Sequence, residues 1–123
     1  MAKKTNFLVI CCTGGNETRN IINLDVLKAL GEKGYLINIS RGTTVNENDL
    51  IFSLQNKIIA GAGLDVYADE PNVPEQLLSM ENVVLLPHIG TATKETRTKM
   101  LSLTLENIQS FFTSGSPLTP VYI

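Results

Sequence analysis

Four short apolar stretches recur along the chain, at residues 7–12, 35–40, 58–66 and 83–87. Their hydrophobicity is continuous instead of alternating, which is typical of parallel strands covered on both faces. The stretches start about one strand-helix unit apart, so right-handed crossovers would join them into a single parallel sheet. The pattern therefore predicts an α/β fold with about four strands and crossover helices.

Helical patterns occupy the first two connections between these strands. Asn23 can cap a helix whose apolar residues point to one side and which ends near Gly31. Asn46, with Asp49 three residues later, resembles a capping pair at the start of a second helix. That helix is expected to bury Leu50, Ile51 and Leu54.

The last two connections differ in length and regularity. Two prolines interrupt residues 67–81, which leaves room for one helical turn near residues 75–80. The longest helix is expected over residues 94–113, before the glycine and prolines of the tail. Its apolar side chains share one face: Leu101, Leu105, Ile108 and Phe112.

Composition narrows the class of protein. With 123 residues, 43% of them hydrophobic, and a net charge of −2, the chain suits one globular domain without affinity for nucleic acid. Its apolar stretches are too short to span a bilayer. Cys11 and Cys12 are adjacent, a poor geometry for pairing with each other, and no second cluster completes a zinc site. A reducing cytoplasmic setting fits best.

Polar residues follow each predicted strand where the strand ends. Arg41, Asp65, Glu70 and the only histidine, His88, all occupy such positions. The carboxyl ends of parallel strands share one rim, where ligands of open α/β sheets bind. An arginine can hold an anionic substrate, and a carboxylate favours the protonated form of a neighbouring imidazole, which can then donate a proton.

Each of these residues also has a purely structural interpretation. His88 after a proline is often structural, Arg41 can be a surface charge, and Glu70 can be an exposed turn residue. Asp65 ends an apolar run, so it either caps a turn or binds something. Cys12 reads as a packing residue more readily than as a nucleophile, since no second histidine is present to activate it.

Four ordered motifs then point to a family: NISRG at 38–42, GAGLDV at 61–66, DEP at 69–71 and PHIGT at 87–91. With this order and spacing the chain, from about Phe7 onward, resembles the C-terminal part of the NAD(P)-binding domain of D-isomer-specific 2-hydroxyacid dehydrogenases. The resemblance is to the glyoxylate, hydroxypyruvate and hydroxyphenylpyruvate reductase branch. It implies a three-layer, Rossmann-like half-domain over residues 1–123 and an enzyme that is a cytoplasmic homodimer when complete.

The resemblance also implies roles for particular residues. Arg41 would bind the carboxylate and carbonyl of a 2-oxo acid, His88 would protonate the carbonyl oxygen, and Glu70 would pair with His88. Hydride would come from NADH or NADPH. The positions that match cofactor-lining residues of the family are Cys12, Thr13, Ile39, Ser40, Arg41, Asp65, His88 and Gly90. No metal is implied.

Two parts of the family pattern are missing from the chain. Gly61-Ala62-Gly63 lies inside a predicted strand, so it does not serve as the GxGxxG turn that holds the pyrophosphate. The separate substrate-binding domain is also absent. The chain is therefore expected to be inactive by itself, and the first strand should have a bare edge that favours self-association.

Three hypotheses about function follow from these observations. The chain is the catalytic part of a 2-oxo acid reductase, or a cofactor-sensing protein like the corepressors that share this fold, or a remnant without a ligand. The sequence leaves the substrate, and the choice between NAD and NADP, undecided.

Overall fold

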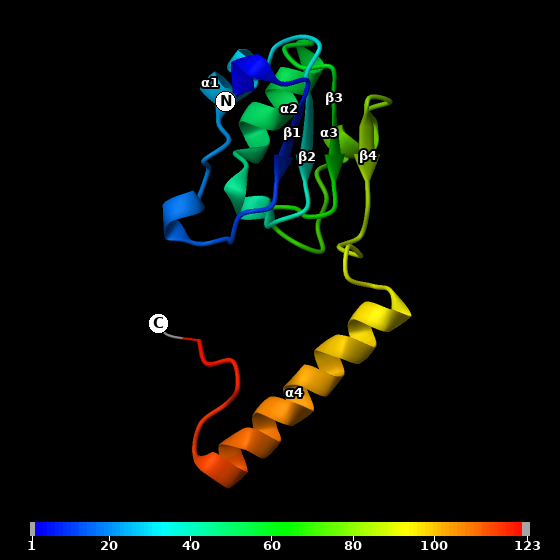
Figure 1. The fold of residues 1–123 in the computed structure, drawn as a ribbon. Coiled ribbons are helices and arrows are strands. Elements are labelled where there is room, and N and C mark those ends of the chain that lie inside the picture. Colours follow the sequence, from blue (N-terminus) through cyan, green and yellow to red (C-terminus); the bar gives the residue numbers. More distant parts are fainter. Residues whose placement is uncertain (1, 122–123) are drawn as a thin grey trace. The chain divides into compact units, whose positions relative to one another are not determined.

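The computed structural model describes residues 2–121, and their contacts group the chain into two units (Figure 1). The first unit ends at Ile89 and the second begins at Gly90. All but one of the site residues expected from the sequence belong to the first unit, and Gly90 belongs to the second.

The first unit contains a four-stranded parallel sheet. Its strands are β1 (Phe7–Ile10), β2 (Tyr35–Asn38), β3 (Gly61–Leu64) and β4 (Val83–Leu85), in the spatial order β1-β2-β3-β4. Each strand is a neighbour of the next one along the chain, as short right-handed crossovers allow. The α/β, Rossmann-like fold class is confirmed, and the carboxyl ends of the strands share one rim.

The crossovers contain helices α1 (Leu24–Leu30), α2 (Glu47–Gln55) and α3 (Glu75–Leu78) and short 3-10 turns at 16–18 and 42–44, and another 3-10 turn at 2–4 precedes β1. Asn23 and Asn46 cap α1 and α2 by accepting the N–H groups of Val26 and Asp49, both at 3.2 Å. The Asp49 carboxylate does not complete a reciprocal capping pair. It accepts the N–H of Leu24 at 2.9 Å and so ties α2 to the start of α1.

The core lies on one face of the sheet. Side chains of Leu36 and Leu64 point into it and pack with Leu27, Leu50 and Leu77 of the helices. Ile51 is only partly buried against this core, unlike the full burial expected for it.

The opposite face of the sheet carries exposed apolar side chains. Phe7 of β1 is 61% exposed and Val84 of β4 is 65% exposed, and Val9 and Tyr35 lie on the same face. Within residues 2–89 the helices therefore form one layer against one face of the sheet. The second helical layer of the expected three-layer arrangement is not formed by these residues. β1 is at the sheet edge, as the sequence indicates. Self-association through it stays a prediction.

The second unit is dominated by α4 (Lys94–Ser114). Thr93 caps it by accepting the N–H of Thr96, and Gly115 ends it at a φ of 78°, a left-handed conformation that suits glycine. The predicted apolar face is present but exposed, and Phe112 is 82% accessible. Among the described residues, none of the helices is both long and apolar enough to cross a membrane.

Candidate functional site

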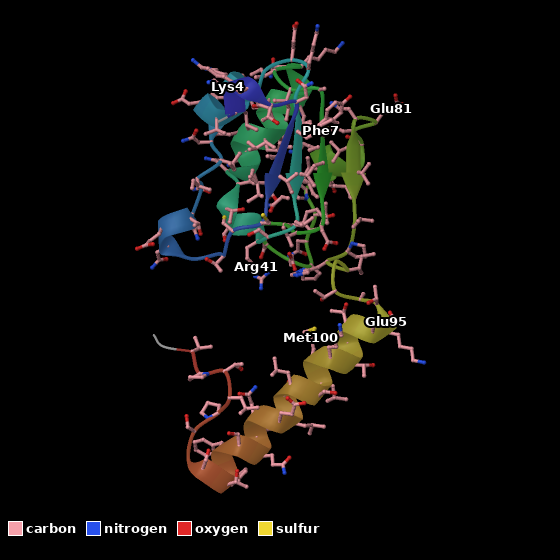
Figure 2. The ribbon with its side chains drawn as sticks, viewed as in Figure 1. Lys4, Phe7, Arg41, Glu81, Glu95 and Met100 are labelled. Atoms are coloured by element: carbon pink, nitrogen blue, oxygen red, sulfur yellow. The ribbon has the colours of Figure 1, made fainter. Side chains whose placement is uncertain are left out.

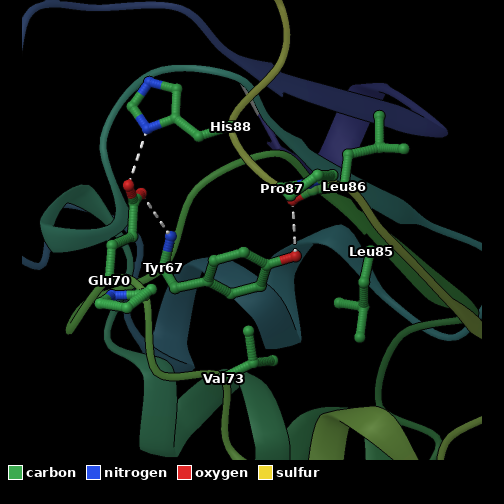
Figure 3. A pocket seen from close by; sticks show the side chains of 8 residues that line it. Tyr67, Glu70, Val73, Leu85, Leu86, Pro87 and His88 are labelled. Atoms are coloured by element: carbon green, nitrogen blue, oxygen red, sulfur yellow. Dashed lines mark hydrogen bonds and ion pairs between the residues drawn. The ribbon is translucent and has the colours of Figure 1, made fainter.

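The centre of the candidate site is a contact between Glu70 and His88. The Nδ1 atom of His88 lies 2.7 Å from Oε2 of Glu70; Glu70 comes from the loop after β3, and His88 from the loop after β4 (Figure 3). Both side chains reach solvent, with exposed fractions of 45% for His88 and 34% for Glu70. The contact occupies Nδ1, which leaves Nε2 on the opposite side of the ring as the nitrogen that can meet a substrate.

The electrostatics of this contact favour an ionised Glu70. The hydrogen bond from His88 lowers the pKa of the Glu70 carboxyl below its ordinary value of 4.5, although partial burial works in the opposite direction. The backbone N–H of Tyr67 and the positive charges of His88 and Arg41 lower this pKa further. A carboxylate that stays ionised keeps accepting the Nδ1 proton, so the Nε2 side of the ring faces outward.

A pH dependence of stability follows from this lowered pKa. Because Glu70 titrates at lower pH in the folded state than in the unfolded chain, its contribution is complete above about pH 4.5. The contribution is lost as pH falls through the folded pKa. We expect the difference in unfolding free energy between the parent chain and Glu70→Gln to shrink across that range, as measured by urea unfolding at a series of pH values.

The matched control for this prediction is Glu81→Gln, which removes an exposed carboxylate from the turn before β4. The difference between this variant and the parent chain should not follow the same pH profile. A Glu70→Gln difference that stays constant from neutral pH to acid would contradict the prediction.

The backbone around His88 is held in an unusual conformation. His88 has a φ of 53°, which L residues seldom adopt without support from their surroundings. The carboxylate of Asp65, a residue only 5% exposed, accepts the N–H of Ile89 at 2.8 Å. Asp65 therefore anchors the residue that follows His88, which is the turn-capping alternative considered for it.

Arg41 follows β2 in a turn built by buried polar side chains. Asn38 donates from Nδ2 to the Arg41 carbonyl at 3.1 Å and accepts the Ser40 N–H at 3.1 Å. The hydroxyl of Thr44 donates to the same carbonyl at 2.7 Å. The guanidinium donates to the Ser40 carbonyl at 2.7 Å, and the side chain is exposed (Figure 2). The head group is thus placed at the rim by its backbone turn.

One cavity of about 390 Å³ lies at the ends of β1 and β2, and it includes some of the expected cofactor positions but not Asp65, His88 or Gly90. Five of the expected positions line it together with Cys11 and Gly14: Cys12, Thr13, Ile39, Ser40 and Arg41. Ser40 donates from its hydroxyl to the Cys12 carbonyl and so ties the two strand ends together. Both cysteines are free and exposed, so the interpretation of Cys12 as a packing residue is wrong.

A second cavity, of about 290 Å³, lies beside the Glu70–His88 contact (Figure 3). Apolar side chains line most of it, including Val73, Leu85 and Leu86, and the ring of Tyr67 forms one wall. Within residues 2–121 no group of three or more His, Cys, Asp or Glu residues is placed to hold a metal ion.

Comparison with known proteins identifies the family of this site. Residues 1–90 match the family described as D-isomer specific 2-hydroxyacid dehydrogenase, NAD binding domain. The chain belongs to this family. The match ends just after His88, so the first unit carries the family's NAD-binding sequence pattern and the family resemblance seen in the four motifs is confirmed.

Relatives within the family have reductase activities. The chain is 47% identical over 121 residues to glyoxylate/hydroxypyruvate reductase A HPR2 of Arabidopsis thaliana and 48% identical to hydroxyphenylpyruvate reductase of Plectranthus scutellarioides. Each alignment covers 98% of the chain and 39% of the relative.

The fold of the chain also resembles that of a solved reductase. The NADPH-dependent glyoxylate/hydroxypyruvate reductase of Sinorhizobium meliloti, in complex with NADP and malonate, matches with a TM-score of 0.95 and 50% identity. This match covers 98% of the chain and 38% of the solved protein. The chain thus spans less than half the length of the relatives it matches.

Three further residues take part in building the site although the sequence analysis gave none of them a role of its own. Asn38 and Thr44 shape the Arg41 turn, and Tyr67 contacts Glu70. For Asn38 a usable signal was its place as a polar residue inside an apolar strand. A buried amide needs hydrogen-bond partners, so a role in building the adjacent turn could have been inferred. No signal of this kind marked Tyr67, whose hydroxyl partner lies 19 positions away.

Proposed function

We propose that this chain supplies the proton donor and the anion-binding arginine of a reductase that converts a 2-oxo acid to the D-2-hydroxy acid. The substrate is glyoxylate, hydroxypyruvate or hydroxyphenylpyruvate, and the reductant is NADH or NADPH. The observation that carries the proposal is the 2.7 Å contact between Glu70 and His88 in a chain of this family.

His88 acts as general acid. Reduction of the carbonyl places negative charge on the substrate oxygen, and a protonated imidazole at that oxygen both stabilises the charge and delivers a proton. The ionised Glu70 holds Nδ1, so the proton leaves from Nε2. After the transfer, the neutral ring keeps its orientation because the Nδ1–H group still donates to Glu70.

Arg41 binds the substrate. Its guanidinium is a fixed positive charge with several donors, which suits the carboxylate and the adjacent carbonyl of a 2-oxo acid. Its charge also lowers the pKa of the Glu70 carboxyl, although by less than the hydrogen bond from His88 does. The turn formed by Asn38 and Thr44 keeps the backbone of Arg41 in place while the side chain engages the acid.

The cofactor-lining residues fit the nicotinamide end of NADH or NADPH. The cavity formed by the ends of β1 and β2 provides a surface beside Arg41, and Asp65 corresponds, by its resemblance to the family, to the position that contacts the nicotinamide carboxamide. When bound, the cofactor supplies the hydride. Gly90 belongs to the second unit, and its contact with the cofactor stays part of this proposal.

By itself the 123-residue chain should turn over negligibly, because no GxGxxG turn holds the adenosine half of the cofactor. The same proposal places the complete enzyme in the cytoplasm as a homodimer. Two free cysteines agree with a reducing compartment.

A chimera tests the function directly. The 121 residues of this chain that align with the Arabidopsis reductase would replace their counterparts in that protein, whose remaining part completes the enzyme. We expect the chimera to oxidise NADPH in the presence of hydroxypyruvate or glyoxylate, because the imported residues provide the acid and the arginine. The measurement is the loss of absorbance of the reduced cofactor.

Two controls interpret the chimera. The Arabidopsis protein without those 121 residues should be inactive, and the isolated chain should be inactive as well. A folded chimera that binds NADPH without reducing any of the three 2-oxo acids would contradict the proposed function and favour a cofactor-sensing role. A folded chimera that does not bind NADPH would favour the remnant hypothesis.

A further inference from the structure

The end of β3 and the turn that follows it hold the His88 segment on both sides of the histidine. The carbonyl of Leu64 accepts the Leu86 N–H at 2.9 Å, which extends the pairing of β3 and β4 beyond Leu85. The carboxylate of Asp65 accepts the Ile89 N–H at 2.8 Å. These bonds fix residues before and after His88.

Tyr67, from the same turn, contacts Glu70 and also the segment that precedes His88. Its backbone N–H donates to Oε1 of Glu70 at 3.1 Å, and its hydroxyl donates to the Leu86 carbonyl at 2.8 Å (Figure 3). The ring is buried, with only 7% of the residue exposed. A single residue therefore orients the carboxylate with its backbone and the histidine segment with its side chain.

The hydroxyl bond matters because the chain between Leu86 and His88 has few other restraints. Pro87 has no N–H to donate, and the Leu86 carbonyl lies beyond the last strand pair of the sheet. Without a donor for that carbonyl, the peptide between Leu86 and Pro87 can turn toward water. The left-handed backbone of His88 would then swing the ring away from Glu70.

We infer that Tyr67 is a positioning residue, whose hydroxyl keeps the Nδ1 atom of His88 on the Glu70 carboxylate through the Leu86 carbonyl. The inference rests on the proposed role of His88 as proton donor. Its physical consequence precedes any reaction. While Nδ1 donates to Glu70, the neutral imidazole carries its proton on Nδ1 and presents a bare Nε2.

This consequence can be measured in the free chain by ¹⁵N NMR of the imidazole. His88 is the only histidine, so the imidazole signals belong to this residue, and their couplings to the ring C–H protons distinguish Nδ1 from Nε2. In the parent chain at a pH where the ring is neutral, we expect Nδ1 to show the shift of a protonated nitrogen. Tyr67→Phe keeps the aromatic ring and the backbone N–H of residue 67. In this variant the tautomer population of His88 should move toward the Nε2–H form that an unrestrained histidine favours.

Two reference variants frame this result. Glu70→Ala removes the acceptor and should move the tautomer in the same direction. Tyr35→Phe removes a hydroxyl from a tyrosine of β2 that stacks on Phe7 and should leave the tautomer unchanged. A folded Tyr67→Phe chain that keeps the parent shifts overturns the inference.

Replacement of Tyr67 by 4-aminophenylalanine tests the hydrogen bond itself. This side chain keeps an N–H donor at the para position, so it should keep the parent tautomer, and it serves also if Tyr67→Phe does not fold. A folded 4-aminophenylalanine variant with the Nε2–H form overturns the inference. Since no cofactor or 2-oxo acid is present, an inactive chimera together with a shifted tautomer in Tyr67→Phe would contradict only the proposed function.

Discussion

Gly42→Ala is expected to destabilise the first unit by about 3 kcal/mol or more, the upper end of the usual cost of overpacking. Gly42 is buried directly after Arg41, and a Cβ added there would lie well inside 3.0 Å of the backbone of Tyr67 and Ala68. Backbone atoms cannot move aside as the end of a side chain can. The Arg41 turn and the turn leading to Glu70 would have to separate, so stability and site geometry would be lost together.

The measurement is urea unfolding followed by the near-ultraviolet circular dichroism of the tyrosines, since the chain has no tryptophan. Gly15→Ala is the matched control. Gly15 is extended, with a φ of 167°, and a Cβ there meets nothing within 4 Å, so its effect should stay within about 0.5 kcal/mol. Equal unfolding free energies for the two variants would contradict the close approach of these turns.

Hydrophobic patterning predicted the strands well because all four are continuous apolar runs. It predicted every strand too long, and the third by the most. The run over 58–66 includes residues that close the end of α2, where Ile58 donates its N–H to the Ser53 carbonyl at 2.8 Å. Ile59 is buried in the core although it lies outside β3. An apolar turn residue and an apolar strand residue look alike in a sequence, because burial alone determines the pattern.

The capping residues show a similar limit. Asn23 and Asn46 act within three residues of their own positions, so their role was visible locally. The Asp49 carboxylate has two oxygens that can each accept a hydrogen bond. One of them accepts the N–H of Leu24, 25 positions away. Which partner a carboxylate takes depends on how α1 and α2 pack, and spacing along the chain does not contain that information.

The sequence predicted the contact at the centre of the candidate site, but it did not predict the hydrogen bonds that hold this contact in place. Rim geometry and the family motifs together predicted that Glu70 and His88 would meet, and they do. The support from Tyr67 depends on a hydroxyl that contacts the carbonyl of Leu86 across two loops. A tyrosine at the end of an apolar run also fits a simple packing role. Only the three-dimensional structure distinguishes packing from hydrogen-bonded support of the His88 segment.

His88→Ala in the chimera is expected to lower kcat by roughly 10² to 10⁴, the contribution of one general acid. The substrate carboxylate would still bind Arg41, so KM for the 2-oxo acid should change far less than kcat. The loss reflects the proton and the charge that the imidazole provides at the carbonyl oxygen. Steady-state kinetics with hydroxypyruvate, at saturating NADPH, separates the two parameters.

Three comparisons make this prediction specific to the imidazole. Added imidazole should restore part of the activity of His88→Ala, because a free general acid can enter the space that the ring leaves. Arg41→Ala should instead raise KM strongly, since it removes the cation that holds the acid. Glu81→Gln, at an exposed turn residue, should leave both parameters unchanged. If His88→Ala keeps kcat within tenfold of the parent chimera, the proton comes from elsewhere and Glu70 orients a residue without a catalytic role.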